Sequence, residues 1–158
     1  LSEPSKPLLR SFLERGFTQE ILDRWGIFWD EHIQGMCIPV RQITGNIMGH
    51  IWRMPQGVNP KYRFSNGLEK SSTLFGVERI SIGVQRVVIV EGPLDAIWVW
   101  EAGFPAVGLL GATISQKQLD LLEVIRCKQI ILCLDNDETG CEASERINEK
   151  LKQRGLVE

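Results

Sequence analysis

The sequence lacks any apolar run close to the roughly 20 residues that a membrane-spanning helix needs. It also lacks a visible signal peptide, an internal repeat and a low-complexity segment. A hydrophobic fraction of 43% and a charged fraction of 24% are typical of a globular protein and argue against disorder. We therefore expect a folded chain that does not enter a membrane. Its 158 residues suffice for one good-sized core, or for a Rossmann-like unit with a smaller lobe.

Soft metal ligands are few and poorly spaced. The chain has four cysteines and two histidines, and no Cys-x-x-Cys pair occurs. The cysteines lie in or beside apolar segments, which predicts buried free thiols and not a zinc site. They are Cys37, Cys127, Cys133 and Cys141. His32 and His50 have no partner at metal-ligand spacing, so we interpret both as structural or solvent-facing.

The net charge of −2 by itself argues weakly against nucleic-acid binding, but the charges are unevenly distributed. Residues 36–70 hold five basic side chains against one acidic, whereas residues 87–158 hold seven against twelve. The five bases are Arg41, Arg53, Lys61, Arg63 and Lys70. A basic lobe beside an acidic one suits a protein that handles phosphates together with metal ions. The alternative is that these bases are only a solvated surface.

The stretch from Val87 to Asp95 organises the second half of the chain. Four consecutive β-branched residues, 87–90, predict a strand buried on both faces, as in a parallel sheet. The strand ends on Glu91, after which Gly92 allows a tight turn and Pro93 can begin a helix. Asp95 lies in the first turn of that helix. Because ligands of open α/β sheets bind beyond the carboxyl ends of the strands, we expect both carboxylates to face one crevice.

A second apolar run, Lys128–Leu134, ends on Asp135 and Asp137 just before another helix. With a period of two along extended backbone, the two aspartates point to the same side and can reach one metal ion or two adjacent ions. Several carboxylates at neighbouring strand ends repel one another unless a cation neutralises them. Hard oxygen ligands favour Mg²⁺ or Mn²⁺ over zinc. Because Glu91 and the aspartates are to share this site, we expect their strands to be adjacent.

The other elements follow from caps, breakers and periodicity. Phe28 and Trp29 are expected to pack under two short N-terminal helices. Ala143, Ile147 and Leu151 are expected to form the buried face of the last helix. The predicted elements are helices at 8–15 and 18–24, a hairpin of strands 36–41 and 46–53, an extended segment at 61–64, a helix at 93–102, a strand at 106–110, a helix from the Ser115 capping box to Ile125, and a helix at 138–154.

Three segments resemble the Toprim domain of primases, topoisomerases and some nucleases. They are Glu91–Asp95, Leu110–Ala112 and Leu134–Gly140. Five upstream segments are similar to the subdomain that precedes Toprim in DnaG-type primases and phage primase-helicases. They are Cys37–Arg41, Gly45, Gly49–Arg53, Pro60–Tyr62 and Leu74–Gly76. The upstream match is the more discriminating, since topoisomerases and Toprim nucleases are not expected to carry it.

The resemblance implies an α/β fold. We expect a Toprim, Rossmann-like parallel sheet with helices on both faces at residues 84–158, preceded by a smaller basic α+β subdomain at residues 1–83. The chain begins with Leu1, and residues 156–158 read as the start of another strand. We therefore expect an excised fragment whose Toprim domain is truncated at its C-terminal end.

The resemblance also implies a function, the synthesis of short RNA primers on single-stranded DNA with two Mg²⁺ or Mn²⁺ ions. Glu91 would be the general base or a metal ligand, Asp135 and Asp137 metal ligands, and Asp95 an outer ligand or orienting residue. The bases implied to bind nucleotide phosphates or template are Arg41, Arg53, Lys61 and Arg63, with Tyr62 stacking or fixing the loop. Implied partners are single-stranded DNA, ribonucleoside triphosphates and a replicative helicase, in trans or fused, in the cytoplasm of a bacterial cell or a phage-infected host.

Three alternatives remain open. A Toprim-family nuclease shares the acidic motifs but leaves the basic segment around Lys61 unexplained. A phosphatase of the haloacid-dehalogenase type would use Asp135 as a nucleophile, yet it needs a lysine and an acidic pair much further downstream than the chain extends. A non-catalytic nucleotide- or DNA-binding module would not require an acidic residue at position 91, so metal titration separates it from the enzymes.

Overall fold

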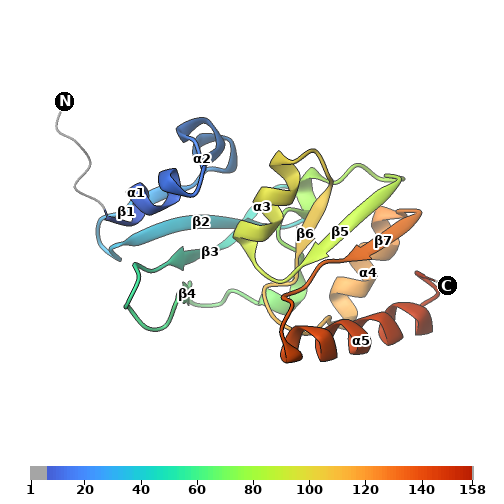
Figure 1. Cartoon of the computed structure of the whole chain (residues 1–158). Helices are drawn as coiled ribbons and strands as arrows, with labels where there is room; N and C mark the ends of the chain where they lie inside the picture. The colour runs from blue at the N-terminus through green and yellow to red at the C-terminus, as the bar shows by residue number, and fades with distance from the viewer. Residues whose placement is uncertain (1–6, 158) are drawn as a thin grey trace. The chain divides into compact units, whose positions relative to one another are not determined.

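The computed structural model describes residues 7–157, which form two compact units (Figure 1). The first unit comprises the described residues up to Val40 together with Ile47–Leu68. The second comprises Arg41–Asn46 and the described residues from Glu69 onward. No helix in this part of the chain is both long enough and apolar enough to cross a membrane.

The first unit is an α+β unit built on a four-stranded sheet. Its strands follow one another in the order β1-β2-β3-β4, which confirms the predicted hairpin of β2 and β3. Register pairs Phe28 with Cys37 between β1 and β2, and Arg53 with Tyr62 between β3 and β4, both antiparallel. The elements are α1 (Pro7–Glu14), α2 (Gln19–Trp25), β1 (Phe28–Asp30), β2 (Gly35–Arg41), β3 (Ile47–Arg53) and β4 (Tyr62–Phe64).

Local signals set the limits of α2. The Thr18 hydroxyl accepts a hydrogen bond from the Ile21 N–H at 3.2 Å, and Gly26 ends the helix in the left-handed region with φ of 67°. These are the cap and stop that the sequence predicts. The prediction for Phe28 is wrong, because this side chain is 53% exposed. It lies on a three-residue edge strand that is held through its backbone, and such pairing does not require the side chain to be buried.

The second unit contains a parallel three-stranded sheet in the order β6-β5-β7. Val88 pairs with Ala106 on one side, and Ile89 pairs with Leu132 on the other, so the strands of Glu91 and Asp135 are adjacent as predicted. The elements are η1 (Lys70–Ser72), η2 (Val77–Arg79), β5 (Arg86–Val90), α3 (Pro93–Glu101), β6 (Ala106–Gly108), α4 (Gln116–Ile125), β7 (Gln129–Leu132) and α5 (Glu138–Gln153).

Helices cover both faces of the parallel sheet (Figure 1). Val87 and Ile89 belong to a core with buried residues of α4 and α5, including Leu122 and Ile147. The alternate residues of β5 point to the opposite face, where α3 packs on β5 and β6. The structure therefore confirms the predicted α/β fold class, with its antiparallel sheet in one unit and its parallel sheet in the other.

The exposed cysteines correct another prediction. Cys37 is buried, but Cys133 and Cys141 are exposed free thiols. Cys133 directly follows β7, an edge strand formed by part of the predicted apolar run, whose residues are alternately exposed and half-buried. A parallel strand at an edge is paired on one side only, so its composition alone overstates its burial.

Candidate active site at the carboxyl edge of the parallel sheet

Glu91 is the half-buried centre of the acidic cluster. It follows β5 directly, and its backbone carbonyl accepts a hydrogen bond from the Leu110 N–H at 2.8 Å. Burial raises the pKa of its carboxyl above the ordinary value, and the charge of Asp135 raises it further. A hydrogen bond from the Asp135 backbone lowers the pKa, while Asp137 and Asp95 raise it to a smaller extent. The four predicted carboxylates are therefore close enough to interact electrostatically.

Asp137 and Asp135 flank the start of α5. Asp137 is the N-cap, and its Oδ1 accepts a hydrogen bond from the Gly140 N–H at 2.7 Å. That bond satisfies one orphan donor of the helix and uses one of the two oxygens of an exposed carboxylate. Asp135 is also exposed. The expectation that both aspartates serve only as ligands therefore omitted the structural role of Asp137.

Gly140 is a site-shaping residue to which sequence reasoning assigned no role. A Cβ at this position would lie 1.9 Å from the backbone carbonyl oxygen of Asp135 and 2.8 Å from its carbonyl carbon. Only glycine lets the first turn of α5 approach Asp135 so closely. The available signal was a glycine within a predicted helix, where it is about 1 kcal/mol worse than alanine unless packing requires it.

Asp95 lies over the turn that Gly92 makes. Pro93 begins α3, and Asp95 follows in its first turn as predicted. A Cβ added at Gly92 would lie 3.0 Å from Oδ2 of Asp95. A glycine at this position therefore gives the Asp95 carboxylate its room beside Glu91.

The donor set of this edge suits a divalent cation that prefers oxygen. A cation would relieve the repulsion that raises the pKa of Glu91. Over residues 7–157, however, no three acidic, histidine or cysteine side chains converge tightly enough to hold one ion. Mg²⁺ is commonly bound through one or two carboxylates, with waters and substrate phosphates completing its shell. The arrangement fits that open mode of binding and not a closed cage of protein ligands.

Arg41 is the predicted phosphate-binding residue that lies in the second unit with the carboxylates. Its Nη1 donates a hydrogen bond to the Gly45 carbonyl at 2.8 Å, and its own backbone carbonyl accepts one from Thr73 Oγ1 at 3.0 Å. Burial raises the pKa of the nearby Glu78 carboxyl, while Arg79 and Arg41 lower it. The side chain of Arg41 is thus tied to its own turn, with a partly buried carboxylate within electrostatic range.

The other predicted bases lie in the first unit around Tyr62. The guanidinium carbon of Arg53 is 5.0 Å from the Tyr62 ring centroid, and Lys61 Nζ is 5.9 Å from it. Cation–π contacts of this kind hold cationic groups near an aromatic face. Arg63 is exposed on β4. Arg53 and Lys61 therefore both lie near the Tyr62 ring, and Arg63 occupies the next position on β4.

Arg53 also lines a small polar cavity of about 240 Å³. The Nη1 of Arg53 is buried and has no hydrogen-bond partner among the described residues. The other lining residues are Ser11, Phe12, Arg15, Met54 and Gln56. Sequence reasoning did not include Arg15, which contributes a second positive charge to this cavity, because nothing in the sequence around the end of α1 connects it with β3.

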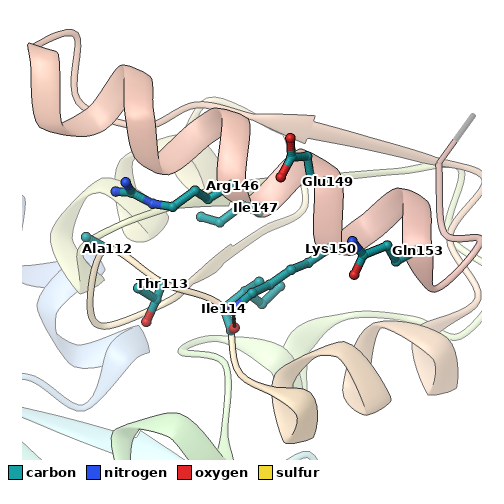
Figure 2. A pocket seen from close by; sticks show the side chains of 8 residues that line it. All are labelled: Ala112, Thr113, Ile114, Arg146, Ile147, Glu149, Lys150 and Gln153. Carbon is teal, nitrogen blue, oxygen red and sulfur yellow. Dashed lines mark hydrogen bonds between the residues drawn. The ribbon is translucent and has the colours of Figure 1, made fainter.

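A second cavity, of about 230 Å³, lies between residues 112–114 and α5 (Figure 2). None of the predicted site residues lines it. Lys150 reaches across from α5, and its Nζ donates a hydrogen bond to the Ile114 carbonyl at 3.0 Å (Figure 2). Arg146 pairs with Glu142 at 3.3 Å on the exposed face, as the i, i+4 spacing predicts. The two basic side chains that line this cavity, Lys150 and Arg146, are thus already paired, and Lys150 holds the loop at residues 112–114 on α5.

Comparisons with known proteins agree with this architecture. A family model described as Toprim-like matches residues 88–158. A DNA primase of Enterococcus faecalis is 27% identical over 173 residues, covering 93% of this chain and 27% of that protein. A DNA primase of Synechococcus elongatus is 32% identical over 127 residues, covering 75% and 18%. The chain thus spans about a quarter or less of the length of these two relatives.

Solved structures show the same fold. The DnaG catalytic core matches with a TM-score of 0.77 at 20% identity, covering 94% of this chain and 61% of that one. A DnaG primase catalytic domain bound to single-stranded DNA matches with a TM-score of 0.73 at 20% identity, covering 92% and 59%. Both units of the chain therefore have counterparts in one known catalytic core.

Proposed function

We propose that the chain belongs to the family of DnaG-type primase catalytic cores with a Toprim domain and is the catalytic core of a DNA-dependent RNA primase. One observation carries the proposal: Glu91 lies at the carboxyl edge of the parallel sheet within electrostatic reach of three aspartates. The antiparallel basic unit supports a primase over a Toprim-family nuclease. In the intact protein the reaction would join ribonucleotides on a single-stranded DNA template.

The acidic edge would supply the catalytic groups. Glu91 and Asp135 would hold two Mg²⁺ or Mn²⁺ ions, with Asp137 contributing the oxygen that does not cap α5. Such ions neutralise triphosphate charge and activate the attacking hydroxyl. The half-buried position of Glu91 raises its proton affinity, which suits it to accept a proton from a bound hydroxyl when it is not a ligand. Asp95 would orient Glu91 from the first turn of α3.

The basic residues would bind phosphates. Arg41 would hold a nucleotide phosphate from its turn in the second unit. In the first unit, Arg53 and Lys61 would contact nucleotide phosphates or the template backbone, with Tyr62 fixing both cations through its ring. Arg63, exposed on β4, would add a contact to the template. A replicative helicase, fused or separate, is the expected protein partner in a bacterial cell or phage-infected host.

A single isosteric substitution tests the proposal in the intact parent protein. Glu91→Gln removes charge without opening a cavity, so the fold and single-stranded DNA binding should be nearly unchanged. Primer synthesis should fall by about 10² to 10³, the usual cost of losing one group that stabilises developing charge. Glu145→Gln, the same change at an exposed position of α5, is the matched control and should synthesise primers at the wild-type rate.

The alternatives give different results in this assay. A nuclease would lose DNA cleavage in Glu91→Gln, and neither its wild type nor any of its variants would synthesise primers. A haloacid-dehalogenase-type phosphatase would tolerate Glu91→Gln and lose all activity in Asp135→Asn. Primer synthesis at the wild-type rate in Glu91→Gln would contradict the assignment of this edge as the active site.

Metal binding has its own test. Millimolar Mg²⁺ or Mn²⁺ should raise the melting temperature, by an amount set by the ratio of metal concentration to dissociation constant. Asp135→Asn should abolish the rise, and Glu145→Gln should retain it. An unchanged melting curve for the wild type in both metals would argue against the proposed ions and favour a non-catalytic binding module.

A further inference from the structure

Gln118 is a buried polar residue whose side chain connects three separate segments of the second unit. It lies in the first turn of α4 and is 1% exposed. Its Nε2 donates hydrogen bonds to the carbonyls of Thr73 at 2.8 Å and Leu109 at 3.0 Å, with a longer contact to Lys70 at 3.4 Å. Its Oε1 accepts one from the Ser115 N–H at 3.0 Å. Both hydrogens of the amide are therefore used, in addition to an oxygen lone pair.

Helix capping explains only half of this arrangement. The capping box needs the bond from Ser115 to Oε1, which a glutamate at position 118 would make equally well. Two carbonyl partners for the amide nitrogen require a donor, and a glutamate carboxylate has none to offer. The choice of an amide therefore points to a role in joining Thr73 and Leu109.

Thr73 extends the network to Arg41. It is 1% exposed, and its Oγ1 donates to the Arg41 backbone carbonyl at 3.0 Å. Arg41 in turn donates from Nη1 to Gly45, so its side chain follows the position of this turn. A shift of Thr73 would consequently move the backbone from which the Arg41 guanidinium projects.

Leu109 extends the network to the acidic edge. Its N–H donates to the Val90 carbonyl at 2.9 Å, and the N–H of Leu110 donates to the Glu91 carbonyl at 2.8 Å. Leu110 has a φ of 61°, a left-handed conformation that non-glycine residues adopt only when their surroundings impose it. The segment after β6 is thus held between Gln118 and the residue that precedes the turn at Gly92.

We propose that Gln118 is a positioning residue, which acts through Thr73 on Arg41 and through Leu109 on Glu91. It fixes the distance between a phosphate-binding cation and the acidic edge, although it touches neither substrate nor metal. All of the residues involved belong to the second unit. The inference rests on the proposed function, because it assigns Arg41 to ribonucleotide binding and Glu91 to catalysis.

The most direct test removes the hydroxyl group of Thr73 by substitution. Thr73→Val keeps the shape of the side chain and removes the donor to Arg41, whereas Thr73→Ser keeps the donor. In the intact parent primase, Thr73→Val should raise the KM for ribonucleotides by about tenfold and change kcat by less than about twofold. Thr73→Ser should remain within about twofold of the wild type. Thr113→Val, the same change at an exposed threonine of the same unit, is the matched control.

A double-mutant cycle distinguishes positioning from general structural damage. If Thr73 acts through Arg41, then Thr73→Val should add no further rise in KM in an Arg41→Ala background. Gln118→Glu should raise KM and also lower kcat, because it disturbs the Leu109 side as well. Melting curves are measured for every variant to establish that it is folded at the assay temperature. If Gln118→Glu is unfolded at that temperature, the comparison of Thr73→Val with Thr73→Ser and Thr113→Val decides the test.

Each outcome bears on a different statement. If Arg41→Ala raises KM while Thr73→Val has the same KM as Thr113→Val, the positioning role is wrong and the proposed function stands. The same conclusion follows if the rises in KM caused by Arg41→Ala and Thr73→Val are additive in the double variant. If Arg41→Ala leaves KM unchanged, the assignment of Arg41 to ribonucleotide binding fails, and the positioning role fails with it. A non-additive pair with rescue by serine supports the inference.

Discussion

Gly140→Ala is the substitution that most directly tests how the acidic edge is built. The added Cβ would lie 1.9 Å from the Asp135 carbonyl oxygen, whereas real Cβ contacts essentially never fall below 3.0 Å, so these atoms must separate by about 1.1 Å. The obstructing atom belongs to the backbone and cannot rotate away. Either the first turn of α5 or the segment around Asp135 must therefore move.

Two opposing free energies decide the size of the effect. Forcing an extra carbon into a filled site costs about 1–3 kcal/mol, and a backbone obstruction belongs at the upper end of that range. Alanine is better than glycine inside a helix by about 1 kcal/mol, an upper limit for a residue in the first turn. The net loss should be about 2 kcal/mol, which corresponds to a fall in melting temperature of about 4–8 °C for a chain of this size.

The site should suffer more than the fold. A displacement of about 1 Å in a catalytic group can reduce the rate by about 10². Primer synthesis should therefore fall by about that factor at temperatures where the variant is folded, and the stabilisation by Mg²⁺ should shrink. Gly111→Ala is the matched control, because its Cβ would meet no atom within 4 Å and its φ is not in the left-handed region. If Gly140→Ala melts and synthesises primers like Gly111→Ala, the close approach to Asp135 has no consequence and the reasoning is refuted.

Three further predictions concern other residues. Burial raises the pKa of Glu78 above 4.5, so its contribution to the free energy of unfolding is present below that pH and is lost as pH rises through the folded pKa. The free energy of unfolding of Glu78→Gln, measured relative to the wild type by urea denaturation, should therefore rise between pH 4 and pH 7; a constant difference would contradict the shift. Lys61→Ala should reduce the slope of log K against log salt concentration for single-stranded DNA binding by about one unit, whereas Lys128→Ala should leave it unchanged. Equal slopes in the two variants would show that Lys61 makes no phosphate contact and is only a solvated surface residue. Because burial and the nearby Asp30 charge raise the pKa of the Cys37 thiol to about 11, a thiol reagent at pH 8 should label the exposed Cys133 first, and simultaneous labelling would indicate that β2 is not buried.

The features that the sequence predicted well depend on neighbours in the chain. The strand before Glu91, the capping box at Ser115 and the buried face of α5 are each encoded within a few residues, by β-branched runs, cap chemistry or helical spacing. The adjacency of β5 and β7 was also predictable, since carboxylates that share a site must follow neighbouring strands. Local pattern and the chemistry of one shared site were sufficient for these elements.

The features that were missed depend on distant parts of the chain or on the edge of a sheet. The capping box at Ser115 was predicted, but the bond from Gln118 to Thr73 spans 45 residues of sequence and leaves no local pattern. Phe28 was predicted to pack under the N-terminal helices and Cys133 to be buried in an apolar segment, yet Phe28 lies on the edge strand β1 and Cys133 directly follows the edge strand β7, where composition does not determine exposure. The division of the chain at residues 83 and 84, and the individual roles of the site residues, stay predictions.

The turn at Arg41–Asn46 limits how the chain can be divided. It belongs to the second unit, although the strands on either side of it belong largely to the first. A cut between residues 68 and 69 would separate Arg41 from Thr73, so the N-terminal fragment would keep the turn and lose the residue that holds it. A chimera that replaces the Toprim part with that of a relative should therefore also exchange this hairpin turn. The turn and the segment from Glu69 onward form one compact unit, although more than twenty residues of the other unit separate them in the sequence.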